Sequence, residues 1–122
     1  MSKKTAILGA SPNPNRYAFL AAERLSASQH EFVPIGIKKG DVLGNQILDL
    51  KEKPKVEDVD TVTMYIGPQN QAEWESYILS LKPNRIIFNP GSENPSLAQK
   101  ATEAGIQTMN ACTLVMIASG MY

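Results

Sequence analysis

The residues from Gly9 to Arg16 are of types that together hold phosphate groups. A short apolar run, Thr5 to Leu8, ends at Gly9, and Ser11 and Arg16 follow within one turn-rich loop. A glycine lets backbone N–H groups approach an anion, a serine hydroxyl adds a donor, and an arginine offers a planar fork that fits phosphate oxygens. A helix that begins after the loop adds the positive end of its dipole. The segment predicts a phosphate-binding turn, with a plain tight turn as the alternative.

The spacing within this turn differs from the dinucleotide fingerprint G-x-G-x-x-G, because only the first glycine is present. Asn15 is of a residue type that caps helices, and we expect it to cap the helix that follows. The candidate ligand contacts in this segment are Gly9, Ala10, Ser11, Asn15, Arg16 and Tyr17.

A second candidate loop carries two lysines, Lys38 and Lys39, directly after the apolar Ile37. In NAD-binding units the corresponding strand end carries an acidic residue that hydrogen-bonds the ribose hydroxyls. A lysine pair instead fits a ligand with an additional phosphate near the adenosine ribose, as in coenzyme A or NADP. The alternative is a solvated lysine pair at a turn.

Two further loops contain small and polar residues that allow a ligand close to the backbone. Ile66 and Gly67 begin the first of them, and Asn89, Pro90 and Gly91 form the second. Glycine and asparagine at strand ends also serve ordinary chain reversal, so these residues are supporting candidates only.

Groups suited to acid–base catalysis are scarce. His30 lies at an expected helix-to-strand junction away from the candidate loops, where a surface or capping role is favoured. The acidic residues form no evident pair, and no cluster of Cys and His has metal-ligand spacing. Cys112 is interpreted as an inert buried thiol, with approach to a ligand thiol as the alternative. We therefore predict no catalytic residue and no metal site.

The elements that position these loops follow from changes in apolar period along the chain. Trp74 and Tyr77 share a helical face and are assigned to the core or an interface. Residues 42–59 show no sustained period and are expected to form a connection with at most one short strand or helical turn. The predicted strands are Thr5–Leu8, Glu31–Ile37, Asp60–Ile66, Arg85–Phe88 and Ile106–Met109. The predicted helices lie within Arg16–Ser28, Trp74–Leu81, Pro95–Ala104 and Asn110–Tyr122.

Strands that alternate with helices in this way predict an α/β fold, a Rossmann-like three-layer sandwich with a five-stranded, mainly parallel sheet. Ligands of such sheets bind beyond the carboxyl ends of the strands. All the candidate loops described above follow predicted strands, so we expect them to meet at that edge.

Length and composition limit the function classes. With 122 residues, 43% of them hydrophobic, residues 1–122 are expected to form one globular domain. Twelve basic residues balance twelve acidic ones, which argues against a nucleic-acid or membrane-surface partner. One cysteine and the lack of a long apolar run favour a cytoplasmic protein without a membrane segment.

The segment Lys4–Tyr17 resembles the opening of the small stand-alone CoA-binding domain proteins, which are similar to the N-terminal domain of the succinyl-CoA synthetase alpha subunit. The resemblance extends along nearly the whole chain, through Pro34, Gly44, Asp60–Val62 and Ala104–Ile106. It implies a Rossmann-like CoA-binding fold.

By the same resemblance Gly9, Ser11 and Arg16 match the phosphate loop of that family, and residues 37–39 match its adenosine-side loop. Ile66–Pro68 departs from the arginines that many members carry before the proline, and Asn110–Cys112 replaces a more basic ending. The phosphohistidine segment and ligase domain of the synthetase have no counterpart here.

The leading hypothesis is a non-catalytic module that binds coenzyme A or an acyl-CoA. The alternatives are a small NADP-linked oxidoreductase and a nucleotide-responsive regulatory or partner subunit. The expected partner is a small nucleotide ligand. The sequence leaves open a protein partner or homo-oligomer, the acyl group and the physiological role.

Overall fold

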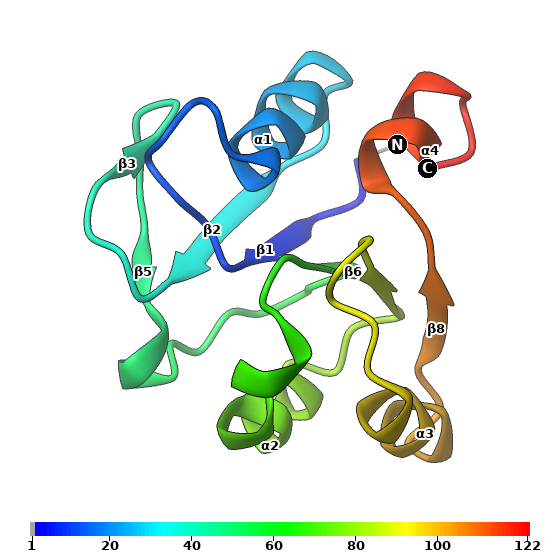
Figure 1. Cartoon of the computed structure of the whole chain (residues 1–122). Helices are drawn as coiled ribbons and strands as arrows, with labels where there is room; N and C mark the ends of the chain where they lie inside the picture. Colours follow the sequence, from blue (N-terminus) through cyan, green and yellow to red (C-terminus); the bar gives the residue numbers. More distant parts are fainter. Residues whose placement is uncertain (1) are drawn as a thin grey trace.

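The computed structural model describes residues 2–122 as a central parallel sheet with helices on both faces (Figure 1). The sheet has six strands in the order β5-β2-β1-β6-β7-β8. Its strands are β1 (Thr5–Leu8), β2 (Phe32–Gly36), β5 (Leu48–Asp49), β6 (Thr61–Met64), β7 (Arg85–Phe88) and β8 (Gln107–Asn110). A separate antiparallel pair consists of β3 (Asp41–Val42) and β4 (Asn45–Gln46).

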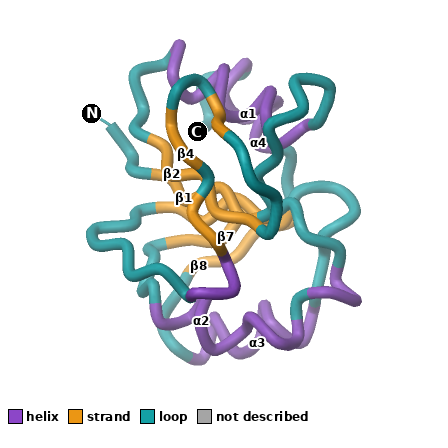
Figure 2. The backbone as a smooth tube through the Cα atoms, turned by 90° about the vertical axis from the view of Figure 1, so that its left-hand side faces the viewer, coloured by secondary structure: helices purple, strands orange, loops and turns teal. Residues whose placement is uncertain are grey.

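The helices form the two outer layers. They are α1 (Tyr17–Ala27), α2 (Glu75–Ser80), α3 (Pro95–Glu103) and α4 (Thr113–Ala118), with the 3-10 helices η1 (Leu50–Glu52), η2 (Pro68–Asn70) and η3 (Ala72–Trp74). Figure 2, turned by 90°, shows α1 and α4 on one face of the sheet and α2 and α3 on the other. The predicted Rossmann-like α/β class is therefore confirmed.

Alternation along the strands divides the core between the two faces. In β1, Ala6 and Leu8 pack in the cluster that contains the buried side chains of α2 and α3, whereas Ile7 packs with α1. All four residues of β1 are buried, as expected for a central parallel strand. The carboxyl end of β1, from which the loop Gly9–Arg16 begins, is therefore fixed in the core of the sheet.

The first helix buries a stripe of small residues. Ala18, Ala21, Ala22 and Leu25 recur at helical spacing and are buried against the sheet. Tyr17, the first residue of this helix, has a side chain that is 70% exposed. Because the buried stripe begins one position later, Tyr17 projects from the start of the helix instead of into the core.

The prediction that Asn15 caps this helix is wrong. The N-cap is Arg16, with extended backbone angles, and no side chain makes a capping hydrogen bond there. Asn13 instead forms a turn just before the helix. Its side-chain oxygen accepts the N–H of Asn15 at 2.9 Å, and its carbonyl accepts the N–H of Arg16 at 3.1 Å. The loop is shaped by this turn, and the helix start is left open.

The five-stranded prediction missed one strand. β5 lies within residues 42–59, where a connection with at most one short strand or helical turn was expected, and it pairs with Ile35 and Gly36 at the edge of the sheet. Its two residues are too few to produce a readable period. Pro34 lies inside β2 opposite Ile7. It is tolerated because β5 pairs only beyond it, so no partner needs its missing N–H.

Candidate functional site

The strand order reverses between β1 and β6, and ligands of open parallel sheets bind at such a reversal. Gly9 follows β1 and Tyr65 follows β6, so both lie at this point. Gly9 has φ +95°, and a Cβ on it would lie 3.0 Å from the carbonyl carbon of Tyr65. Only glycine allows the two strand ends to approach this closely.

Three adjoining cavities follow the carboxyl edge of the sheet. We call the turn at Lys38 and Lys39 the lysine turn. The largest cavity, of about 500 Å³, lies between this turn and the loop after β6, and we call it the lysine-turn cavity. The next, of about 340 Å³, lies at the start of α1 and is called the helix-start cavity. The third, of about 220 Å³, reaches the beginning of α4 and is called the α4 cavity.

Shared walls join the three cavities into one groove. Gly9, Lys38 and Tyr65 line both the lysine-turn and the helix-start cavities. Tyr17, Tyr65 and Pro90 line both the helix-start and the α4 cavities. The groove therefore extends from the β2 and β5 side of the sheet to the β7 and β8 side.

The structure brings most of the predicted contact residues to this groove. Asn15 and Lys39 are exposed and line none of its three cavities. Those that line it are Gly9, Ala10, Ser11, Arg16, Tyr17, Ile37, Lys38, Ile66, Gly67, Asn89, Pro90 and Gly91.

The start of α1 presents free donors to the helix-start cavity. Within residues 2–122 the N–H groups of Tyr17 and Ala18 have no recorded acceptor, and the first turn contains no acidic residue. Ser11 accepts the N–H of Asn13 at 3.1 Å, which leaves its own hydroxyl hydrogen available. Together with the Arg16 side chain, these groups form a cationic, donor-rich site suited to a phosphate.

Gly36 is a site residue that the sequence analysis missed. A Cβ on it would lie 2.8 Å from the carbonyl oxygen of Ala10, so the end of β2 packs directly against the phosphate turn. It also lines the lysine-turn cavity. A glycine at the end of a strand, just before a candidate loop, was the available signal.

The sequence analysis also missed an apolar wall and a further cation. Trp74, which was assigned to the core or an interface, is half-buried, packs against the core and also lines the lysine-turn cavity together with Ile37 and Lys38. Tyr77, from the same predicted helix, is buried as expected and donates to the carbonyl of Pro54 at 2.6 Å. Lys51, from η1, lines the lysine-turn cavity as well.

The Asn89 side chain is used inside the protein. Its amide nitrogen donates to Thr63 Oγ1 at 2.7 Å and to the carbonyl of Met64 at 2.9 Å. Its oxygen accepts the N–H of Thr113 at 2.8 Å. Asn89 is 3% exposed, so it fixes β6, β7 and α4 relative to one another and has little surface left for a ligand.

The Gln71 side chain joins the two loops after β6 and β7. Its nitrogen donates to the carbonyls of Ile66 and Ser92, both at 2.8 Å, and its oxygen accepts from Asn94 Nδ2 at 2.9 Å. Gln71 is fully buried. It therefore sets the distance between the loops that begin at Ile66 and Asn89.

Tyr65 lies against all three cavities. Its hydroxyl is buried and has no hydrogen-bond partner within residues 2–122. Burial raises the pKa of Tyr65 to about 12, an effect that the nearby hydroxyls of Thr63 and Thr113 oppose. The phenol is neutral at physiological pH and contributes no charge to the groove.

Cys112 is half-buried at the start of α4 and lines the α4 cavity. Among residues 2–122, no three His, Cys, Asp or Glu side chains are grouped so that they could hold a metal ion. None of the helices in that range has the length and apolar character needed to cross a membrane.

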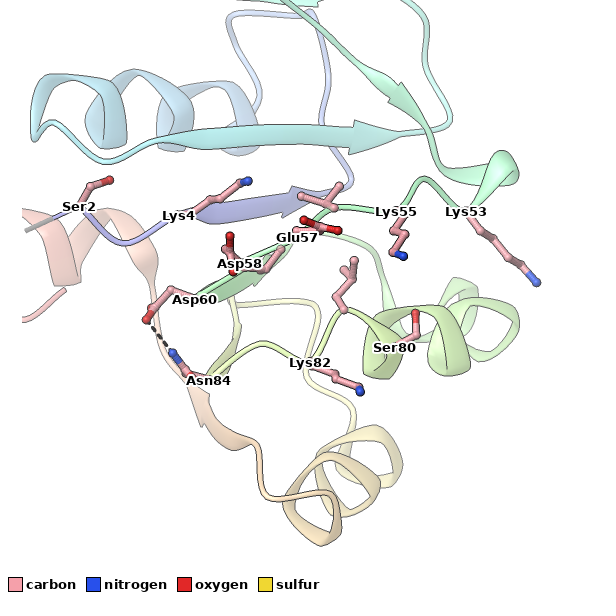
Figure 3. Close-up of a pocket in the computed structure, with 13 residues that line it drawn as sticks. Ser2, Lys4, Lys53, Lys55, Glu57, Asp58, Asp60, Ser80, Lys82 and Asn84 are labelled. Atoms are coloured by element: carbon pink, nitrogen blue, oxygen red, sulfur yellow. Dashed lines mark hydrogen bonds between the residues drawn. The ribbon is translucent and has the colours of Figure 1, made fainter.

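A larger cavity, of about 920 Å³, lies at the opposite edge of the sheet (Figure 3). Its walls include Lys4, Asp60 and Asn84, which precede β1, β6 and β7. Asn84 Nδ2 donates to Asp60 Oδ2 at 3.0 Å, and Lys53 and Lys82 extend outward. Both lysines and carboxylates line it, so the cavity is not selectively cationic and is not the candidate site.

Comparison with known proteins supports the fold assignment. A search of curated proteins found no match. The crystal structure of an uncharacterized protein is 56% identical, with a TM-score of 0.97 over 100% of this chain and 99% of that one. A hypothetical protein from Pyrococcus horikoshii OT3 is 25% identical, with a TM-score of 0.83 over 97% of this chain and 83% of that one. A Thermus thermophilus protein described as cell-free ID.343 is 20% identical, with a TM-score of 0.82 over 99% and 91% of the two chains.

The family comparison covers nearly the whole chain. A model described as CoA binding domain matches residues 3–118, which include every wall of the groove described above. The resemblance seen in the phosphate turn thus extends through α4, the last helix. The chain belongs to the CoA binding domain family.

Proposed function

We propose that the groove at the carboxyl edge binds coenzyme A or an acyl-CoA, and that the protein acts as a non-catalytic binding module. One observation carries the proposal. The open start of α1, with Arg16 as its N-cap, lines the same groove as the lysine turn, and Lys38 forms part of both cavities. Two cationic sites along one groove suit a ligand with a diphosphate and a separate phosphate.

The lysine-turn cavity suits the adenosine part. Ile37, Ile66 and Trp74 offer apolar walls for a base, while Lys38 and Lys51 offer charge for a phosphate on the ribose. Glu73 also lines this cavity, so the added phosphate belongs on the lysine side.

The helix-start cavity suits the diphosphate. The N–H groups of Tyr17 and Ala18, the Ser11 hydroxyl and the Arg16 guanidinium all serve as donors there, and the helix dipole adds to them.

Calorimetry with CoA, acetyl-CoA, NAD and NADP tests the proposal. We expect saturable binding of both CoA species and weaker binding of NAD, which lacks the phosphate that the lysine turn would hold. Clear binding of a nicotinamide nucleotide with no response to either CoA species would overturn the proposal and favour the oxidoreductase alternative.

Replacing Arg16 with alanine should weaken CoA binding by about 1.5 kcal/mol or more, since charge-assisted hydrogen bonds to phosphate are lost. Arg24→Ala is the matched control, because Arg24 lies in the last turn of the same helix and is exposed away from the groove. Calorimetry of the two variants separates a local effect from a change in net charge. Equal affinities for Arg16→Ala and Arg24→Ala would remove Arg16 from the site.

A further inference from the structure

The α4 cavity lies at the far end of the groove from the lysine turn. It is lined by Tyr17, Tyr65, Asn89, Pro90, Cys112 and Leu114. Three of these, Tyr17, Tyr65 and Pro90, also form the wall of the helix-start cavity. A ligand with its diphosphate at the start of α1 can therefore extend directly into the α4 cavity.

The α4 cavity has no charged wall. None of the described residues that line it is acidic or basic. The Asn89 amide is committed to Thr63, Met64 and Thr113, and the Tyr65 hydroxyl is buried and neutral. Tyr17 and Leu114 present mostly apolar surface, and Cys112 behaves as a small apolar side chain. The cavity is suited to an uncharged, apolar group.

The cations of the groove are confined to two of its three cavities. Lys38 and Lys51 line the lysine-turn cavity, Arg16 and Lys38 line the helix-start cavity, and no cation lines the α4 cavity. An acyl-CoA has the same division, since its phosphorylated adenosine and diphosphate are followed by an uncharged arm that ends in the thioester. The two patterns coincide only when the thioester end lies at α4.

We propose that the α4 cavity receives the thioester end of the ligand and selects short, uncharged acyl groups over acyl groups that carry a carboxylate. This inference rests on the proposed binding of CoA. It adds the class of acyl group, which that proposal leaves open. A carboxylate in the α4 cavity would lose its hydration without gaining a cationic partner, and this desolvation would weaken the binding free energy.

A calorimetric series tests this selectivity with CoA, acetyl-CoA, propionyl-CoA, butyryl-CoA and succinyl-CoA. Each added methylene should tighten binding about two- to fourfold, the range expected for partial to full burial of a CH₂ group. Succinyl-CoA should bind more weakly than butyryl-CoA, which has the same number of acyl carbons.

Equal affinities for CoA and butyryl-CoA would refute the proposal that the α4 cavity holds the acyl group, while leaving the proposed CoA binding in place. So would succinyl-CoA that binds as tightly as butyryl-CoA. A protein that binds no member of the series overturns both the acyl cavity and the proposed function, so the two failures are distinguishable.

Neighbouring residues of α4 provide a matched pair of variants. Leu114 lines the cavity, whereas Val115 is 63% exposed and does not. Leu114→Asn should remove the gain per methylene, and Val115→Asn should keep it. A gain per methylene that survives Leu114→Asn would contradict the proposal.

The single cysteine gives a readout on the unmodified protein. Because Cys112 is the only thiol in the chain, an alkylating reagent reports on the α4 cavity alone. Saturating butyryl-CoA should slow its alkylation several-fold more than saturating acetyl-CoA does, and neither ligand has a free thiol that would consume the reagent. Identical alkylation rates with the two ligands would show that the acyl group lies elsewhere.

Discussion

The contact between Gly36 and Ala10 shows how a single residue sets the shape of the phosphate turn. The carbonyl oxygen of Ala10 lies where a side chain on residue 36 would begin, at 2.8 Å from the position of a Cβ. The neighbouring N–H groups of Gly9 and Ala10 both donate to the carbonyl of Ile35, at 2.9 and 3.1 Å. The turn is thus built directly on the end of β2.

Gly36→Ala should destabilise the protein by about 1–3 kcal/mol, the usual cost of adding atoms to a well-packed region, because the contact involves backbone that cannot rotate away. Denaturant unfolding without ligand measures the loss. Gly67→Ala is the control, since a Cβ there would meet only the end of the Gln69 side chain, which can move. Similar losses of stability in the two variants would refute this account of Gly36.

Single residues differ in how far the sequence reveals their roles. The placement of Gly9 and Arg16 beside the groove followed from residue type and from position after a strand. The internal role of Asn89 did not, because its partners Thr63 and Thr113 are distant in sequence and meet it only in the folded chain. The contribution of Trp74 to a cavity wall was not predicted, because helical spacing does not distinguish a cavity wall from a packed interior or an interface.

Between elements, Gln71 connects the two loops that close one side of the groove. The carbonyls of Ile66 and Ser92 both accept from its amide nitrogen, and Asn94, the N-cap of α3, donates to its oxygen. The position of α3 is therefore coupled to the loop after β6. Such a link keeps the cavity walls in place without a bound ligand.

Gln71→Met, which is similar in length but cannot donate, should destabilise the protein by about 1–3 kcal/mol, since two buried carbonyls lose their donor. Hydrogen exchange should become faster at residues 66–67 and 91–92. Gln69→Met serves as the control because Gln69 is exposed on η2. Unchanged exchange in both loops after Gln71→Met would show that Gln71 does not join them.

Elements were predictable where their pattern was long enough to repeat. β1, β7 and α3 were expected within one residue of their observed ends, and Asn94 and Pro95 provide the capping signals that mark the start of α3. Residues 42–59 were not predictable, because β3, β4 and β5 contain two residues each and depend on pairing partners elsewhere. The Asn15 cap failed because an asparagine two positions earlier forms the turn.

At the scale of the whole molecule, residues near the two ends of the chain meet at the amino edge of the sheet. Tyr122 contacts the Thr5 hydroxyl through its own hydroxyl, and its ring lies 4.4 Å from the Arg85 guanidinium carbon. The His30 ring lies 5.1 Å from that of Tyr122, and His30 Nδ1 accepts the N–H of Lys3 at 2.8 Å. These contacts fasten the segment after α4 to the edge of the sheet opposite the groove.

His30 should make stability depend on pH. Burial, followed by the charge of Lys3, lowers the pKa of His30 below its ordinary 6.5. The unfolded chain therefore takes up a proton first as pH falls, so the stabilisation is complete above about pH 6.5 and is lost as pH falls below that value. Nδ1 of His30 accepts the hydrogen bond from Lys3 only while it is unprotonated, so the loss of this bond also lowers stability as pH falls.

Two measurements check this prediction. His30 is the only histidine, so its titration by NMR is unambiguous, and the pKa should lie below 6.5. His30→Asn keeps an acceptor but does not titrate, so its free energy of unfolding should fall less between about pH 7.5 and about pH 5.5 than that of the wild type. A pKa at or above the ordinary value, or identical pH profiles, would refute the prediction.

The contact between Lys3 and Tyr122 has a consequence for chain connectivity. Lys3 Nζ lies 2.5 Å from the carbonyl oxygen of Tyr122, so the backbone from residue 3 to residue 122 is almost a closed ring. The turn between β3 and β4, at Leu43 and Gly44, is exposed and lines none of the three cavities of the groove. A short peptide joining the ends would allow the ring to be opened at that turn, because the packing of the layers does not depend on where the chain begins.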